Sequence, residues 1–118
     1  MHSAEVLDHF KNPRNAGELA DATAAVDATN PVCGDVLRLA VRVEDGRISA
    51  VRFKAQGCVA ALASASALTE LIAGKSLNEA WSVTAAQISA ALGGLPQATF
   101  HGAQLASDAL VALFAKLS

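Results

Sequence analysis

The chain has 118 residues, enough for one domain but too few for two independent hydrophobic cores, so we expect a single domain over residues 1–118. Its 9 basic and 11 acidic side chains give a formal net charge of −2, which excludes the strong positive field that binds nucleic acids or anionic membranes. Apolar residues make up 53% of the chain and aromatic residues only 4%, a composition typical of close-packed helices rather than of an all-β sandwich.

Cysteine content and the N-terminus indicate the compartment. No stretch approaches the roughly 20 apolar residues that span a bilayer, and the N-terminus lacks a basic segment followed by an apolar one. We therefore expect a cytoplasmic protein. A structural disulfide between Cys33 and Cys58 would be unusual in that reducing compartment, so the two thiols are expected to have another purpose. A core of this size stabilises a fold by about 5–15 kcal/mol without a metal, so a bound metal would serve function.

A short helix is predicted at the start of the chain. It begins after Ser3, a favourable N-cap residue, and ends before Pro13, which forces the preceding residue out of the helical region. We expect His9 to lie at the surface of this helix, exposed or partly buried. One face of the helix carries the apolar residues Val6, Leu7 and Phe10.

Three strands are predicted next, beginning with an edge strand over residues 22–29. Alternating apolar and polar residues predict a half-buried strand over residues 37–43. A three-residue loop over residues 44–46, with Gly46 in the left-handed conformation, then leads into the third strand. This loop would set Leu37 opposite Phe53, Leu39 opposite Val51 and Val41 opposite Ser49. The outer face carries a basic stripe, expected to be solvated surface, of Arg38, Arg42, Arg52 and Lys54.

The second half of the chain has helical periodicity. An alanine-rich helix over residues 59–73 is expected to stop at Gly74. Capping-box patterns at residues 76–79 and 84–87 predict a short turn and a further helix, and a last helix is predicted over residues 103–117. With strands in the first half and helices in the second, the predicted class is α+β, a small antiparallel sheet covered by helices.

The candidates for chemistry lie at the boundaries of these elements. Cys33 and Asp35 are two positions apart, which in an extended segment turns both side chains to the same face. Cys58 follows a glycine at the start of a helix, where free amide groups and the helix dipole favour a thiolate and the glycine leaves room for a neighbour. His101 opens the last helix beside Gly102, where a ligand is expected to approach the backbone.

Two thiols, a carboxylate and an imidazole are ligand types that bind zinc tetrahedrally or hold an iron–sulfur unit. Their spacing matches no zinc finger, so the fold would have to assemble such a site. The residues alone leave open a pair of buried, unreactive cysteines with a helix-capping histidine, or a Cys58 nucleophile with His101 as its base. Ser64 and Ser66 lie in the alanine-rich helix without a nucleophile motif and are expected only to allow close helix packing.

A set of segments runs in order along nearly the whole chain: His9–Asn15, Asn30–Asp35, Gly57-Cys58, Thr69-Glu70 with Gly74-Lys75, and Leu92–Pro96. Together they resemble the IscU/NifU N-terminal family of iron–sulfur cluster assembly scaffolds, and the segments around the two cysteines are specific to that family. The resemblance implies a three-stranded antiparallel sheet with helices and a cluster site at one end. The short distance between the second cysteine and the histidine resembles the IscU type.

The resemblance also implies a function. Members of the family receive sulfur from a cysteine desulfurase, build a [2Fe–2S] cluster and hand it to recipient proteins, and many bind zinc at the same site. The resemblance therefore implies a non-enzymatic scaffold or carrier that holds a transient [2Fe–2S] cluster, iron or Zn²⁺. The positions of this chain that match the family's ligands are Cys33, Asp35, Cys58 and His101.

Two departures from the family pattern affect this expectation. The family's third cysteine, its main acceptor of persulfide sulfur, directly follows the histidine, where this chain has Gly102. The family's chaperone-recognition segment Leu-Pro-Pro-Val-Lys is replaced by Leu-Pro-Gln-Ala-Thr at residues 95–99. These changes argue against sulfur loading by the usual route and against release by the dedicated chaperone. The alternative hypothesis is a diverged zinc-binding or interaction protein that docks a cysteine desulfurase without accepting sulfur.

Overall fold

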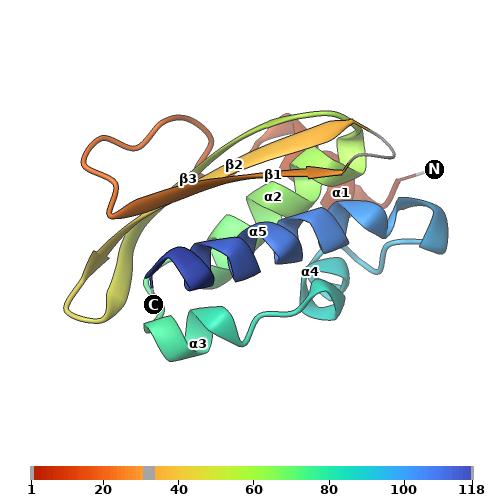
Figure 1. Cartoon of the computed structure of the whole chain (residues 1–118). Helices are drawn as coiled ribbons and strands as arrows, with labels where there is room; N and C mark the ends of the chain where they lie inside the picture. The colour runs from red at the N-terminus through yellow and green to blue at the C-terminus, as the bar shows by residue number, and fades with distance from the viewer. Residues whose placement is uncertain (1, 31–33, 118) are drawn as a thin grey trace.

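The computed structural model describes residues 2–30 and 34–117, in which strands precede most of the helices (Figure 1). The predicted α+β class is confirmed, with a three-stranded antiparallel sheet in the order β1-β2-β3. The elements are α1 (Ala4–Lys11), β1 (Ala24–Asn30), β2 (Asp35–Glu44), β3 (Arg47–Gln56), α2 (Val59–Ile72), α3 (Leu77–Trp81), α4 (Ala85–Ala91), a 3-10 turn η1 (Gln97–Thr99) and α5 (His101–Leu117).

The hairpin between β2 and β3 does not have the predicted register. Leu39 lies opposite Phe53 instead of Val51, and the other predicted pairs are displaced in the same way. The connecting loop has two residues, 45 and 46, both with positive φ, rather than three. A two-residue loop alone would place apolar residues opposite charged ones, but a bulge at residues 42–43 shifts the pairing by one and restores a continuous apolar face.

Helices α2 and α5 lie side by side beneath one face of the sheet, with α3 and α4 farther from it (Figure 1). The small side chains of α2, mostly alanine and serine, allow the two helices to approach closely. Leucine and isoleucine side chains from the sheet and both helices close the core, and Leu39, Ile48, Leu68 and Leu113 are fully buried. The packing aligns the N-terminal ends of α2 and α5 at one end of the molecule.

The apolar face predicted for α1 is only partly buried, and polar contacts also join α1 to α2. Leu7 and Phe10 are 38% and 40% exposed, whereas His9 is buried, contrary to the expectation that it lies at the surface. His9 Nδ1 lies 2.8 Å from Ser66 Oγ, and the same hydroxyl accepts the backbone N–H of Arg14 at 2.8 Å. Ser66 therefore fastens α1 to α2 and does more than allow close packing.

Thr69, one turn further along α2, completes this cluster. Its hydroxyl donates to the backbone carbonyl of Ser66 at 2.7 Å and, in the same bifurcated hydrogen bond, to the backbone carbonyl of Arg14 at 3.1 Å. We call His9, Arg14, Ser66 and Thr69 the α1 anchor. The segment Asn12-Pro13-Arg14 thus forms a loop in which the backbone of Arg14 is hydrogen-bonded to two polar side chains of α2.

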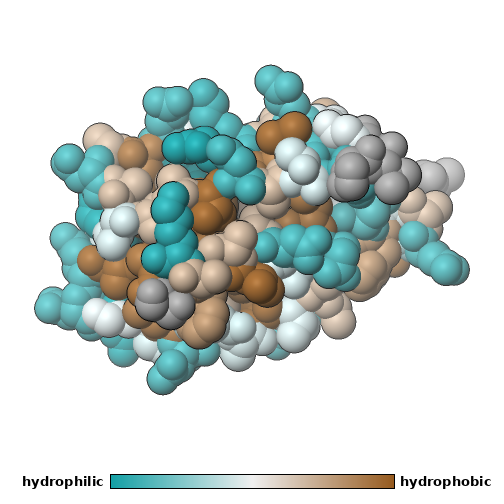
Figure 2. All heavy atoms as spheres, in the orientation of Figure 1, coloured by the Kyte–Doolittle hydropathy of each residue, from teal (hydrophilic) through white to brown (hydrophobic). Residues whose placement is uncertain are grey.

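The surface carries paired charges and, towards the end of α5, a group of exposed apolar side chains. On the outer face of the sheet Arg38 lies 3.1 Å from Asp27, as expected of a solvated stripe. Brown patches lie among teal ones on the face that carries α5 (Figure 2). Towards the end of α5, Phe114 is 46% exposed and packs edge-on against Trp81. Within the described residues, no helix has the length and hydropathy that crossing a bilayer requires.

Candidate metal centre

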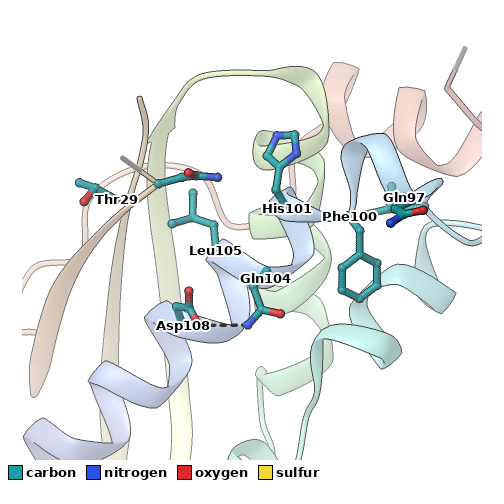
Figure 3. Close-up of a pocket in the computed structure, with 9 residues that line it drawn as sticks. Thr29, Gln97, Phe100, His101, Gln104, Leu105 and Asp108 are labelled. Atoms are coloured by element: carbon teal, nitrogen blue, oxygen red, sulfur yellow. Dashed lines mark hydrogen bonds between the residues drawn. The ribbon is translucent and has the colours of Figure 1, made fainter. Parts of the chain in front are cut away.

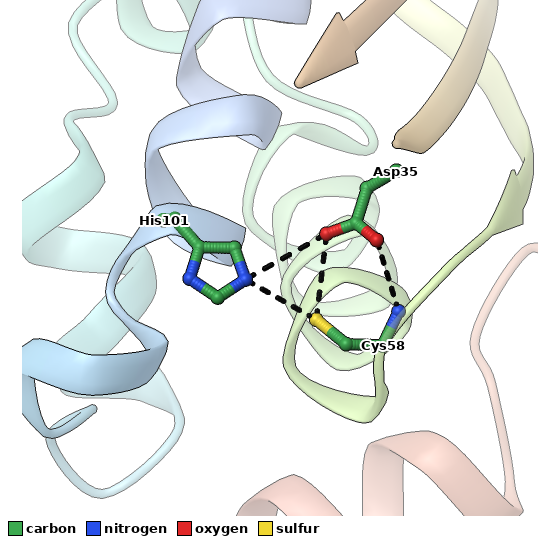
Figure 4. Close-up of side chains that lie close together, drawn as sticks. All are labelled: Asp35, Cys58 and His101. Carbon is green, nitrogen blue, oxygen red and sulfur yellow. Dashed lines mark hydrogen bonds and ion pairs between the residues drawn. The ribbon is translucent and has the colours of Figure 1, made fainter. Parts of the chain in front are cut away.

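Three of the four predicted ligands converge at the N-terminal ends of α2 and α5 (Figure 4). Cys58 Sγ lies 3.4 Å from Asp35 Oδ2 and 3.4 Å from His101 Nε2, and the imidazole nitrogen lies 3.6 Å from the same carboxylate oxygen. We call Asp35, Cys58 and His101 the donor triangle. Cys33, the remaining predicted ligand, lies outside the described residues.

Local backbone structure places each of the three. Asp35 is the first residue of β2, and His101 is the first residue of α5, which begins two residues before the predicted start at residue 103. Cys58 is the N-cap of α2 in extended backbone, and its sulfur accepts the N–H of Ala61 at 3.4 Å, the contact that a serine or aspartate oxygen usually makes. A common face for Cys33 and Asp35 requires extended backbone at Gly34, but Gly34 has φ +73°.

A hydrogen bond and a packing contact fix the position of the Asp35 side chain. One carboxylate oxygen accepts the backbone N–H of Cys58 at 3.1 Å, which joins the start of β2 to the start of α2. Gly57 packs directly against the same carboxyl group: a Cβ at position 57 would overlap Oδ1 and lie 2.6 Å from Cγ. The neighbour for which this glycine leaves room is therefore the Asp35 side chain, which is only 3% exposed.

Gly102 has a different environment from the predicted one. The sequence predicts a ligand close to the backbone there, but the neighbour is the first turn of α2. A Cβ at position 102 would lie 2.7 Å from the carbonyl carbon and oxygen of Ala60 and 2.9 Å from the nitrogen of Ala61. Gly102 therefore allows close contact between two helices, and the site where the resemblance places a third thiol has no room for a side chain.

The surroundings of Cys58 oppose the predicted thiolate. Burial raises the pKa of the Cys58 thiol, and the carboxylate of Asp35 raises it further. The backbone N–H groups of Ala60 and Ala61 lower that pKa, but their effect is smaller than the combined effect of burial and Asp35. Cys58 is therefore a thiol that donates its proton to Asp35 Oδ2. A Cys58 nucleophile with His101 as base would lack an activated sulfur.

The spacing of the triangle matches the spacing of ligands around one ion. Ligands of a tetrahedral zinc ion lie at about 2.3 Å for sulfur and 2.0–2.2 Å for nitrogen or oxygen, so any two of them are roughly 3.3–3.7 Å apart. The three distances in the triangle, 3.4, 3.4 and 3.6 Å, fall in this range. A cation at its centre would take the place of the proton now shared between sulfur and carboxylate.

A cavity of about 710 Å³ opens beside His101 (Figure 3). Its walls come from the end of β1, from η1 and from α5, and Gln104 and Asp108 of α5 are hydrogen-bonded to each other at 3.1 Å. No local pattern in the sequence indicates this cavity, because its lining is drawn from segments far apart in the chain. The remaining lining residues are Thr29, Asn30, Leu95, Gln97, Phe100 and Leu105.

The known proteins that resemble this chain include iron–sulfur cluster assembly scaffolds. The family described as "NifU-like N terminal domain" matches residues 1–117. The iron–sulfur cluster assembly scaffold protein IscU 1 of Archaeoglobus fulgidus is 44% identical over 110 residues, covering 93% of this chain and 72% of the relative. The scaffold protein IscU of Haemophilus influenzae is 42% identical over 120 residues, covering 97% and 93%. A putative SUF-system scaffold protein from Fervidobacterium islandicum shares the fold, with TM-score 0.77, 21% identity and 95% coverage of both chains.

Proposed function

Because the chain belongs to the family of NifU-like N-terminal domains, we propose that it is a scaffold or carrier in iron–sulfur cluster assembly and not an enzyme. The observation that carries the proposal is the convergence of a thiol, a carboxylate and an imidazole within 3.6 Å of one another. The proposed ligands are Cys33, Asp35, Cys58 and His101. Cys33 lies two residues before Asp35 in the sequence. The cargo is a labile [2Fe–2S] cluster or a single iron or zinc ion.

The donor set favours a loosely held cargo. A [2Fe–2S]²⁺ unit with two thiolates, one carboxylate and a neutral imidazole carries a net charge of −1, whereas a third thiolate in place of the imidazole would give −2. The lower negative charge and the harder ligands raise the reduction potential and weaken the hold on the cluster. Zinc with the same ligands also carries −1 and needs only a tetrahedron, so the isolated domain is expected to take up zinc at least as readily.

The proposed partners follow from the same role. A cysteine desulfurase would supply sulfur and recipient proteins would accept the cluster, all in the cytoplasm. Gly102 places no thiol beside His101, so sulfur would arrive at Cys33 or Cys58. The segment at residues 95–99 departs from the family's chaperone-recognition sequence, so release would not depend on that chaperone.

Anaerobic reconstitution with iron and sulfide tests the proposal. The unaltered chain is expected to form a species that absorbs in the visible, and Cys58→Ala is expected to lose it because a thiolate ligand is missing. Ser64→Ala is a matched control, since Ser64 lies in the same helix away from the triangle. The absence of any coloured species in the unaltered chain, or its undiminished formation in Cys58→Ala, would contradict the proposal.

The second candidate function is a diverged protein that docks a desulfurase without accepting sulfur. The glycine at position 102 and Thr99 in the altered chaperone segment favour it. Incubation with a cysteine desulfurase and sulfur-labelled cysteine separates the two functions. Label recovered on Cys33 or Cys58 supports the scaffold, and a stable complex without label supports the docking protein.

A further inference from the structure

We propose that Gly57 and Gly102 set the size of the donor triangle, so that in its closed form the site fits one tetrahedral ion and must open to hold a two-iron cluster. The inference rests on the proposed function only for the identity of the cargo. The part that concerns single ions stands on the packing of these two glycines.

Gly102 fixes the corner occupied by His101. Because a Cβ at position 102 would lie 2.7 Å from the backbone of Ala60, α5 touches the first turn of α2 at a distance that admits a side chain at position 102 only if the two helices move apart. His101 precedes it in the chain and Cys58 caps the helix that it touches. The close contact of the two helices therefore brings His101 Nε2 to 3.4 Å from Cys58 Sγ.

Gly57 fixes the corner occupied by Asp35. Its φ of +143° and the contact with the Asp35 carboxyl group leave no room for a side chain. The carboxylate fills the space over Gly57, with one oxygen bonded to the Cys58 N–H and the other facing sulfur and imidazole. A methyl group at position 57 would push this carboxylate out of the triangle.

A two-iron cluster requires a different arrangement. The four terminal ligands of a [2Fe–2S] core are divided between two irons, so if all three donors bind it, two of the three donor pairs span the core. Those pairs must be farther apart than ligands of one ion, whereas all three distances here are 3.4–3.6 Å. Cluster loading therefore needs the triangle to open, and a side chain at either glycine favours that opening.

The first experiment adds one methyl group at position 102. Gly102→Ala is expected to lower zinc affinity roughly 10–100-fold, the range produced by residues that position metal ligands. Chelator competition measures the affinity, and Co²⁺ in place of zinc should lose the strong visible bands of a tetrahedral site. In a His101→Ala background the same substitution should have no further effect, which a merely structural role would not produce. Leu113→Ala, a destabilising change at the far end of α5, should leave zinc affinity unchanged.

The second experiment uses the other corner and stands even if Gly102→Ala does not fold. Gly57→Ala should weaken zinc binding, and Asp35→Ala should remove that effect. Gly74→Ala is the matched control, because Gly74 also has positive φ, +76°, but open space where a Cβ would lie, so it carries backbone strain without displacing a donor. Far-UV circular dichroism of each metal-free variant establishes that it folds.

Iron and sulfide loading completes the test. Both glycine variants should retain the visible-absorbing cluster species while they lose zinc, so that the ratio of cluster to zinc rises. Unchanged zinc affinity in a folded glycine variant, a loss that persists without His101 or Asp35, or two Co²⁺ ions per unaltered chain would overturn the proposal. If the unaltered chain binds zinc as expected but forms no cluster, the proposed function fails and the size-setting role of the glycines does not.

Discussion

The α1 anchor and the donor triangle each place a histidine against α2, yet only one of them has the character of a metal site. His9 Nδ1 meets the Ser66 hydroxyl at 2.8 Å, and its Nε2 lies 3.7 Å from Glu70, an exposed carboxylate. His101 Nε2 meets a thiol and a buried carboxylate that also contact each other. A buried histidine is therefore not a site in itself, because the ligand types of its neighbours decide what it can bind.

The two clusters also differ in how their charges are balanced. In the anchor, neutral hydroxyl and backbone groups satisfy the buried atoms, and the guanidinium of Arg14 pairs with Asp8 at 2.6 Å. In the triangle, a carboxylate and a thiol share one proton within a space that fits a cation. Loss of the thiol proton would leave two adjacent negative charges, which a metal ion compensates.

Replacing each of the two histidines by alanine in turn should give the largest difference in zinc affinity. His101→Ala should lower zinc affinity by more than the roughly 10–100-fold typical of residues that only position ligands. His9→Ala should leave zinc affinity unchanged and lower the free energy of unfolding. Chelator competition and urea unfolding, applied to both variants, measure the two properties separately. A loss of zinc binding in His9→Ala would contradict the division between anchor and triangle.

The pH dependence of zinc binding should be nearly as large. Because burial and Asp35 raise the pKa of Cys58, zinc must displace the thiol proton at neutral pH. Affinity should therefore rise with pH by about tenfold per unit for each thiol proton released, and level off above the pKa of the thiol. Titrations over a series of pH values measure the slope. A flat profile below that pKa would mean that Cys58 is not a ligand.

Two serines on α2 allow a sharper test of the anchor. Ser66→Ala leaves the N–H of Arg14 and the buried His9 ring without their partner, so it should cost about 1–3 kcal/mol in unfolding free energy. Ser64 is equally buried, but its hydroxyl has no hydrogen-bond partner within the part of the chain that the structure describes. Ser64→Ala should therefore be neutral or stabilising by urea unfolding. Equal losses in both variants would show that the anchor bonds contribute nothing.

The anchor histidine should also make stability depend on pH. Burial lowers the pKa of His9, the charge of Arg14 lowers it further, and Glu70 and Asp8 oppose the shift. Protonation therefore favours the unfolded chain, so the contribution of neutral His9 is intact above about pH 6.5 and is lost as pH falls from there through the folded-state pKa. The unfolding free energy should begin to fall as the pH drops below about 6.5, and it should fall less in His9→Gln. An identical drop in His9→Gln would assign it to other groups.

Local signals in the sequence predicted most of the secondary structure. The alanine-rich helix and its stop at Gly74 are confirmed, with α2 ending at Ile72, and both capping boxes open helices at the predicted positions. These features depend on neighbouring residues, which one sequence contains in full. The hairpin register was wrong because a β-bulge costs little locally and is selected by the apolar face that the whole sheet must present.

The sequence predicted which three described residues come together at the candidate site, but it did not predict the electrostatics there. Residue types and family motifs identified Asp35, Cys58 and His101, which the fold brings together. The helix dipole suggested a thiolate at Cys58, but burial and the nearby carboxylate are tertiary effects and outweigh it. The contact between Gly102 and α2 joins residues that are 41 or 42 positions apart, so no local pattern could have indicated it.

The smallest effect is expected where a polar contact is neither buried nor part of either cluster. Arg38 and Asp27 lie 3.1 Å apart on the outer face of the sheet, but both side chains are more than half exposed. Water and salt screen such a pair, so Arg38→Ala should change the unfolding free energy by no more than about 0.5 kcal/mol and leave zinc affinity unchanged. Urea unfolding at low and high salt measures the change. A loss as large as that in Ser66→Ala would mean that burial does not separate the anchor from ordinary surface contacts.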